Sequence, residues 1–228
     1  MKFFEQFHDL TVFERILWLV SATVIIVSFA VSGGGDVLTL IASLIGVTAL
    51  IFVAKGYVLG QVLTVVFAVF YGIISFFFSY YGEMITYLCM TAPIAIMTTI
   101  EWIKNPYKGT KEVAVSKITA KQAVTMGVAA AAATAILGYV LFLLGNANLL
   151  FSIISITTSF VASWLTLLRS PYYAIAYALN DIVLIVLWVL ATMESLSYLP
   201  MVLCFVMFLL NDMYGFFNWR RMAKRQSL

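Results

Sequence analysis

The sequence predicts an all-α integral membrane protein with eight transmembrane helices, and three observations support this fold class. Of the 228 residues, 64% are hydrophobic and only 10% are charged, whereas soluble domains average about 25% charged residues. The apolar residues form eight runs, most of which approach the roughly 20 residues that a helix needs to cross a bilayer. The thirteen Lys and Arg residues lie in the short segments outside these runs. Spans of this length should be helical, because lipid offers an open backbone no hydrogen-bond partner.

The predicted elements follow one another along the whole chain. Residues 1–14 place Phe3, Phe7 and Leu10 on one helical face, which predicts a short interfacial helix. The next run, residues 16–31, lacks the basic segment and the A-x-A site of a signal peptide and is therefore predicted to be an uncleaved first span. The seven further predicted spans are residues 37–54, 57–79, 84–103, 122–144, 149–168, 172–193 and 198–217.

The distribution of charge predicts the orientation of these spans. With eight spans, all thirteen basic residues fall on one side of the membrane. The other side has Asp36, Glu83 and Glu194 and no basic residue. By the positive-inside rule, both termini are expected in the cytoplasm. The net charge of +3 does not indicate nucleic-acid binding, because the basic residues sit only in short segments between helices.

A weak internal repeat predicts how the helices are grouped. Residues 55–102 and 169–219 share an order of features: a short basic motif, a span, a Tyr-Leu pair, and a second span that ends in Trp. With the preceding span added, two three-helix bundles are expected, 37–103 and 149–219. A single helix separates them, so the bundles should have the same orientation. The remaining units are an N-terminal interfacial segment with the first helix (1–36), a cytoplasmic loop with a linker helix (104–148), and a basic tail (220–228).

Polar side chains inside the last two spans predict a substrate site. Each span contains an Asn-Asp pair, and a charge at such depth costs about 2.5–3.5 kcal/mol, so these groups should face a bundle interior or a wet cavity. Amides together with Tyr and Trp suit a molecule with a ring and several hydroxyl groups better than a bare ion. The alternative is that the pairs only join helices by hydrogen bonds. The predicted substrate-binding residues are Gln61, Tyr71, Tyr177, Asn180, Asp181, Trp188, Asn211, Asp212, Tyr214 and Asn218.

Other kinds of site find little support in the sequence. The single histidine, His8, lies in the N-terminal segment, and Cys89 and Cys204 lie within apolar runs, where packing is the expected role. No H-E-x-x-H motif, close acidic cluster or G-x-x-x-x-G-K-[ST] phosphate-binding loop occurs. We therefore predict no metal, no cofactor and no enzymatic activity. An intramembrane enzyme is the least favoured alternative.

Several motifs together resemble the PnuC family of bacterial vitamin transporters. They are KGY (55–57), YYGE (80–83), EW (101–102), the Asn180-Asp181 pair followed by Trp188, and NDMYGFFNWRR (211–221). The similarity extends over most of the chain from about residue 37 and is strongest from 159 to 222. It implies a fold similar to the sugar-conducting SWEET proteins, in which two three-helix bundles are joined by one helix, with residues 16–31 as an extra first helix.

The resemblance also implies a function. Members of the family admit nicotinamide riboside by facilitated diffusion, and a cytoplasmic kinase then traps it by phosphorylation. The expected substrate is nicotinamide riboside or another ribo- or deoxyribonucleoside. The alternatives are thiamine, riboflavin and a proton-coupled version of the same transport. The resemblance implies a location in the bacterial cytoplasmic membrane, a small-molecule partner and a homotrimer.

Two positions can be compared with the family pattern in detail. Asp181 matches an acidic residue common in the seventh span, and Asn211 matches an asparagine in the eighth. The nicotinamide riboside carriers usually have a W-x-x-W pair ahead of the acidic position, where this chain has Ala174 and Tyr177. This difference makes another nucleoside a candidate substrate.

Overall fold

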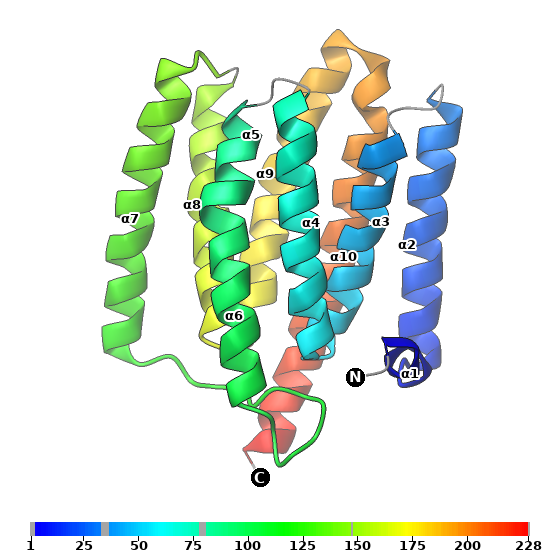
Figure 1. Cartoon of the computed structure of the whole chain (residues 1–228), viewed down its shortest axis with the longest axis vertical. Coiled ribbons are helices and arrows are strands. Elements are labelled where there is room, and N and C mark those ends of the chain that lie inside the picture. Colours follow the sequence, from blue (N-terminus) through cyan, green and yellow to red (C-terminus); the bar gives the residue numbers. More distant parts are fainter. Residues whose placement is uncertain (1–2, 33–36, 78–80, 147, 228) are drawn as a thin grey trace.

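The computed structural model describes residues 3–32, 37–77, 81–146 and 148–227, and their regular structure is helical apart from two isolated bridges (Figure 1). Within these residues, eight helices are long and apolar enough to cross a membrane. The predicted all-α membrane fold is therefore confirmed. Asp36, Ser79 and Tyr80, which the sequence arguments used, lie outside the described residues. The elements are α1 (Phe3–His8), α2 (Val12–Val31), α3 (Val37–Ala54), α4 (Val58–Phe77), α5 (Tyr81–Ile85), a π-helical segment (Thr86–Thr91), α6 (Ala92–Lys104), α7 (Ala120–Leu143), α8 (Leu149–Leu167), α9 (Tyr173–Glu194), a 3-10 turn (Leu196–Tyr198) and α10 (Leu199–Gln226).

The first span begins earlier than its hydropathy indicates. Thr11 caps α2 and forms a capping box with Glu14, in which the Thr11 backbone N–H donates to the Glu14 carboxylate at 2.7 Å. Because this box satisfies the free N–H groups of the first turn, the helix starts at Val12 rather than near residue 16. The predicted interfacial segment is accordingly divided between α1 and the first turn of α2.

The fourth span is not one continuous α-helix. α5 leads into a π-helical segment, and α6 follows with Pro93 in its first turn. A proline lacks the backbone N–H and its ring crowds the carbonyl four residues earlier, so the α-helical hydrogen-bond ladder cannot continue unchanged there. The backbone widens by one π turn instead, a feature found mostly inside α-helices and frequently at functional sites.

Six of the described helices form a closed ring. α3 contacts α4, α4 contacts α6, α6 contacts α8, α8 contacts α9, α9 contacts α10, and α10 returns to α3. α2 lies outside the ring against α3 and α10, and α7 lies outside it against α8 (Figure 1). The grouping into two parallel three-helix bundles stays a prediction.

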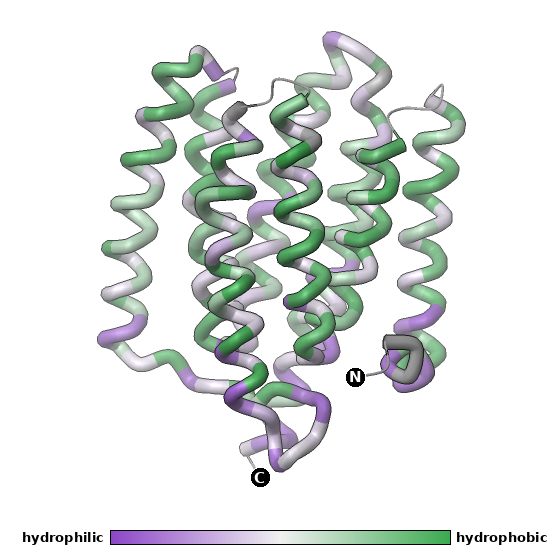
Figure 2. The backbone as a smooth tube through the Cα atoms, in the orientation of Figure 1, coloured by the Kyte–Doolittle hydropathy of each residue, from purple (hydrophilic) through white to green (hydrophobic). Residues whose placement is uncertain are grey.

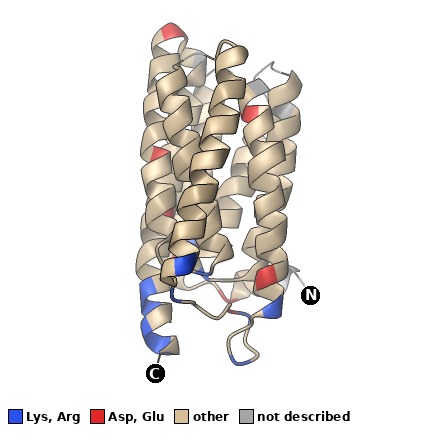
Figure 3. Cartoon of the chain, turned by 90° about the vertical axis from the view of Figure 1, so that its left-hand side faces the viewer, with Lys and Arg blue, Asp and Glu red and all other residues tan. Residues whose placement is uncertain are grey.

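Charge and hydropathy divide the molecule along its long axis. The helices are apolar over most of their length, and hydrophilic residues gather toward the end that holds both termini (Figure 2). The described Lys and Arg residues also lie at this end (Figure 3), which we call the basic end. Large apolar side chains are exposed along the outward faces of α2 and α7, for example Val27 and Ile136. These faces match a lipid environment, where such exposure costs nothing.

Candidate functional site

A cavity of about 430 Å³ opens at the end of the molecule opposite the basic end. Its walls come from α4, α5, the π-helical segment, α8, α9 and α10, together with the connection between α7 and α8. The cavity reaches from the exposed Glu194, at the end of α9, down to Asn180 in the same helix. At 1.5 Å per residue, this distance is about 21 Å along the helix, so the cavity extends well into the membrane-spanning region.

Asn180 is a predicted site residue that lies in this cavity. Its side chain is buried, and its amide oxygen accepts hydrogen bonds from the hydroxyl groups of Thr158 (2.8 Å) and Ser155 (3.3 Å), both on α8. These two bonds fix the orientation of the amide. The amide NH₂ group makes no hydrogen bond within the described part of the chain, so it is available to a ligand.

Trp188, two turns further along α9, is a second predicted residue in the cavity wall. Its side chain is only 8% exposed, and its indole N–H has no hydrogen-bond partner among the described residues. The indole ring packs against Tyr198 with ring centroids 5.7 Å apart. A buried donor without a partner costs about 1–3 kcal/mol. A ligand acceptor in the cavity would remove this cost.

Glu83 is a cavity residue that the sequence argument did not select. It lies in α5, and one of its carboxyl oxygens is buried without a hydrogen-bond partner in the described structure. Tyr71, a predicted site residue on α4, lines the same cavity as Glu83. Tyr71 also packs against Tyr87 with ring centroids 4.7 Å apart. A carboxylate and two aromatic faces therefore meet on one wall of the cavity.

The serines of α8 were also missed, although the sequence contained a signal for them. Ser152, Ser155 and Ser159 line the cavity, and their spacing of i, i+3, i+7 places them on one face of a helix. Short hydroxyl side chains are common in transmembrane helices, so this pattern alone did not separate a binding face from a packing face.

Asp181 and Asp212 form a buried pair behind the cavity wall. Each residue is 3% exposed, Asp181 lies on α9 and Asp212 on α10, and one carboxyl oxygen of Asp181 has no hydrogen-bond partner among the described residues. Neither residue is part of the cavity lining described above.

The other predicted residues on α10 face neighbouring helices. The Asn211 amide donates to Ser21 of α2 at 3.0 Å, the Tyr214 hydroxyl donates to Glu14 of α2 at 2.7 Å, and the Asn218 amide donates to the Ala54 carbonyl of α3 at 2.8 Å. These contacts join helices, which is the alternative that the sequence left open. Their role in substrate binding stays a prediction.

Two further predicted residues also lie away from the cavity. The Tyr177 hydroxyl and the Ser163 hydroxyl are 2.9 Å apart and join α9 to α8. Gln61 is buried near the start of α4. Like the α10 residues, both lie outside the lining of the cavity.

Comparison with known proteins assigns the chain to a family. The family model described as nicotinamide mononucleotide transporter matches residues 36–221. The chain belongs to this transporter family. It is 28% identical over 228 residues to the nicotinamide riboside transporter PnuC of Neisseria mucosa, covering 98% of this chain and 86% of that protein. It is also similar to the crystal structure of the vitamin B3 transporter PnuC, with a TM-score of 0.81, 26% identity, and coverage of 95% of this chain and 94% of that one.

These matches confirm the resemblance to the PnuC family and identify the chain as a multi-pass membrane transporter. For a transporter of this family, the lining of the cavity selects among possible ligands. It combines aromatic faces, hydroxyl and amide donors, and the carboxyl groups of Glu83 and Glu194. None of the described lining residues is Lys, Arg or His. The lining therefore favours a cation and disfavours a phosphate group.

Proposed function

We propose that the chain takes up nicotinamide riboside, or a closely similar cationic nucleoside, by facilitated diffusion through this cavity. The observation that supports this proposal is the Glu83 carboxyl group beside the Tyr71 and Tyr87 rings. The nicotinamide ring of the nucleoside is a pyridinium, whose positive charge is attracted by a carboxylate and by aromatic faces. The unbonded NH₂ of Asn180 and the N–H of Trp188 would bind the ribose hydroxyl and carboxamide oxygens.

The same geometry argues against a phosphorylated substrate. A nucleoside monophosphate would bring its negative charge into a lining that holds two carboxyl groups and, among the described residues, no basic side chain. Like charges at close range in a site of low dielectric repel strongly. We therefore propose the unphosphorylated nucleoside as the substrate and place phosphorylation after uptake, on the cytoplasmic side.

The side of the membrane to which the cavity opens follows from the charge of the two ends. If the basic end is cytoplasmic, as the positive-inside rule indicates, both termini lie inside a bacterial cytoplasmic membrane and the cavity faces outward. Transport would require the ring helices to move so that the same cavity opens toward the basic end. A homotrimer remains a prediction from the family resemblance.

Thiamine is a second candidate, because its thiazolium ring is also a cation and the Glu83 argument applies to it equally. Neutral deoxyribonucleosides were suggested by Ala174 and Tyr177 in place of the W-x-x-W pair. Ala174 is fully buried and Tyr177 is bonded to Ser163, so this substitution lies outside the cavity wall. The charge of Glu83 then favours the cationic candidates.

The test of this proposal is ligand-induced stabilisation of the purified protein, followed by uptake into liposomes. Nicotinamide riboside should raise the melting temperature through preferential binding to the folded state. Nicotinamide mononucleotide, thymidine and riboflavin should have little effect. Equal stabilisation by neutral nucleosides, or stabilisation by the mononucleotide instead of the riboside, would contradict the assignment.

Glu83→Gln keeps the size of the side chain and removes its charge. We expect the affinity for nicotinamide riboside to fall about tenfold or more, because an opposite charge close by is lost in a partly buried site. Glu194→Gln provides the comparison: Glu194 is exposed at the mouth of the cavity, where solvent screens its charge, and a smaller loss is expected. Titration of each variant with the riboside distinguishes the two carboxylates.

Trp188→Phe removes the indole N–H and keeps an aromatic ring. Because this N–H has no partner among the described residues, we expect substrate affinity to fall about fivefold with little loss of thermal stability. Trp219→Phe should lower thermal stability and leave substrate affinity little changed, since the Trp219 indole N–H donates to the Val53 carbonyl at 2.9 Å within the buried core. Equal effects of the two variants on affinity would count against Trp188 as a substrate donor.

A further inference from the structure

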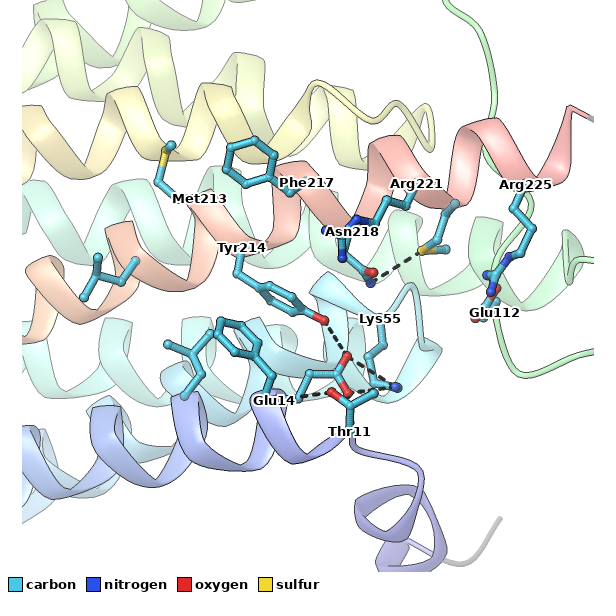
Figure 4. Close-up of a pocket in the computed structure, with 14 residues that line it drawn as sticks. Thr11, Glu14, Lys55, Glu112, Met213, Tyr214, Phe217, Asn218, Arg221 and Arg225 are labelled. Atoms are coloured by element: carbon cyan, nitrogen blue, oxygen red, sulfur yellow. Dashed lines mark hydrogen bonds and ion pairs between the residues drawn. The ribbon is translucent and has the colours of Figure 1, made fainter.

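A second hollow, separate from the substrate cavity, lies outside the helix ring at the basic end (Figure 4). It has a volume of about 910 Å³ and runs between the start of α2 and the part of α10 from Leu210 to Arg225. Its lining includes no residue of the cavity described above. We call it the α2–α10 groove.

One part of the groove is apolar and open to the surroundings of the protein. Phe13 is 59% exposed, Phe217 is 56% exposed, and Met213 is 39% exposed. Leu17 and Leu210 continue this wall. In a membrane protein, such a wall at the side of the helices is suited to an acyl chain, because it presents no polar group that would need a partner.

The other part of the groove is charged, with three cations and two carboxylates. Lys55 is paired with Glu14 at 3.0 Å, and Arg225 is paired with Glu112 (Figure 4). Arg221 lies one turn before Arg225 on α10 and has no ion-pair partner within the described residues. The groove therefore has one positive charge in excess, located on Arg221.

The apolar part and the charged part of the groove follow one another in the same order as the acyl chain and the head group of a phospholipid. The apolar wall lies toward the centre of the spans, and Arg221 and Arg225 follow at the polar end of α10. Basic pockets between transmembrane helices at the membrane surface bind anionic lipid head groups. A zwitterionic head group fits less well, because both carboxylates that could bind its ammonium group are already paired with Lys55 and Arg225.

We propose that the α2–α10 groove binds one anionic phospholipid, with its phosphate on Arg221 and an acyl chain along Phe13, Met213 and Phe217. The bound lipid contacts both helices and thereby stabilises the packing of α2, which lies outside the ring, against α10, which belongs to the ring. The occupant is defined by a phosphodiester charge combined with an acyl chain. A free phosphate has only the first of these.

The test uses full-length protein stripped of lipid and titrated with phosphatidylglycerol, phosphatidylethanolamine or inorganic phosphate. Native mass spectrometry counts bound lipids, and thermal unfolding reports stabilisation. We expect one tightly bound phosphatidylglycerol that raises the melting temperature. We expect weaker binding of phosphatidylethanolamine and no stabilisation by phosphate. Equal binding of the two lipids, or full stabilisation by phosphate alone, would overturn the proposal.

A pair of matched variants locates the site. Arg221→Gln should weaken phosphatidylglycerol binding about fivefold, as expected for one basic residue at the membrane surface. Arg220→Gln removes an equally exposed charge from the neighbouring position, where the guanidinium lies 5.6 Å from the Phe216 ring centroid and outside the groove. This control should leave tight binding intact. Equal losses in both variants, or no loss in Arg221→Gln, would mean that the lipid is not held in the groove.

Discussion

Replacing Gly60 with alanine is expected to destabilise the transporter strongly. A Cβ atom at this position would lie 2.4 Å from the backbone nitrogen of Val53 and 2.8 Å from the backbone carbon of Phe52. These are backbone atoms at the end of α3, so no side chain can rotate away, and α4 would have to move from α3. Overpacking of this kind costs about 1–3 kcal/mol, occasionally more, and we expect the upper end of that range. Thermal unfolding in detergent measures the effect.

Gly127→Ala is the matched control for this substitution. Gly127 lies within α7, and a Cβ atom there would meet nothing within 4 Å. Alanine is a better helix former than glycine by about 1 kcal/mol, so this variant should be as stable as the parent or slightly more stable. Similar melting temperatures for the two alanine variants would contradict the close approach of α3 and α4.

Lys55→Met should have the second large effect on stability. The Glu14 carboxyl group is almost completely buried, and the Lys55 ammonium group lies 3.0 Å from it. Removing one partner of a buried ion pair leaves an uncompensated charge, which costs about 3–5 kcal/mol. The double variant Lys55→Met, Glu14→Gln should recover much of this loss, since no buried charge then remains. The unfolding free energies of the parent, the two single variants and the double variant together form a double-mutant cycle, which measures the interaction between Lys55 and Glu14.

An exposed ion pair of the same chain provides the comparison. Lys111 and Asp9 are 2.6 Å apart, but the lysine side chain is 51% exposed. Exposed pairs contribute about 0–1 kcal/mol, so Lys111→Met should change stability little. If Lys111→Met lowered stability as much as Lys55→Met, burial would not be the cause of the large contribution expected from the Lys55–Glu14 ion pair.

The fold class was predictable because it depends on length and hydropathy, which are local properties of the chain. The eight apolar runs correspond to the eight helices that, within the described residues, are long and apolar enough to cross a membrane. Length and hydropathy do not indicate the π-helical segment of the fourth span, which arises where Pro93 interrupts the hydrogen-bond ladder of a packed helix. The early start of α2 depended on the Thr11–Glu14 capping box, which a hydropathy window does not detect.

The candidate site was harder to predict than the fold, because sequence identifies polar residues but not the neighbour that each one faces. Asn180 and Trp188 lie in the cavity wall. Asn211 and Tyr214 bond to α2, a helix that lies outside the ring, and none of the four predicted residues on α10 lines the cavity. Glu83 directly precedes the predicted span 84–103, where a charge is easily solvated, so the sequence does not mark it as a site residue, yet the structure places it in the cavity wall.

The π-helical stretch Thr86–Thr91 has a consequence for how members of this family could differ in cargo. Its wider turn accommodates one more residue than an α-helical path would need. Each residue of an α-helix advances by about 100°, so loss of one residue in this stretch would rotate Glu83 away from the cavity relative to α6. No residue of the cavity wall outside this stretch would have changed identity. A single-codon deletion here would thus alter ligand charge preference, and alignments of homologues should be inspected for gaps at this point before conserved letters are compared.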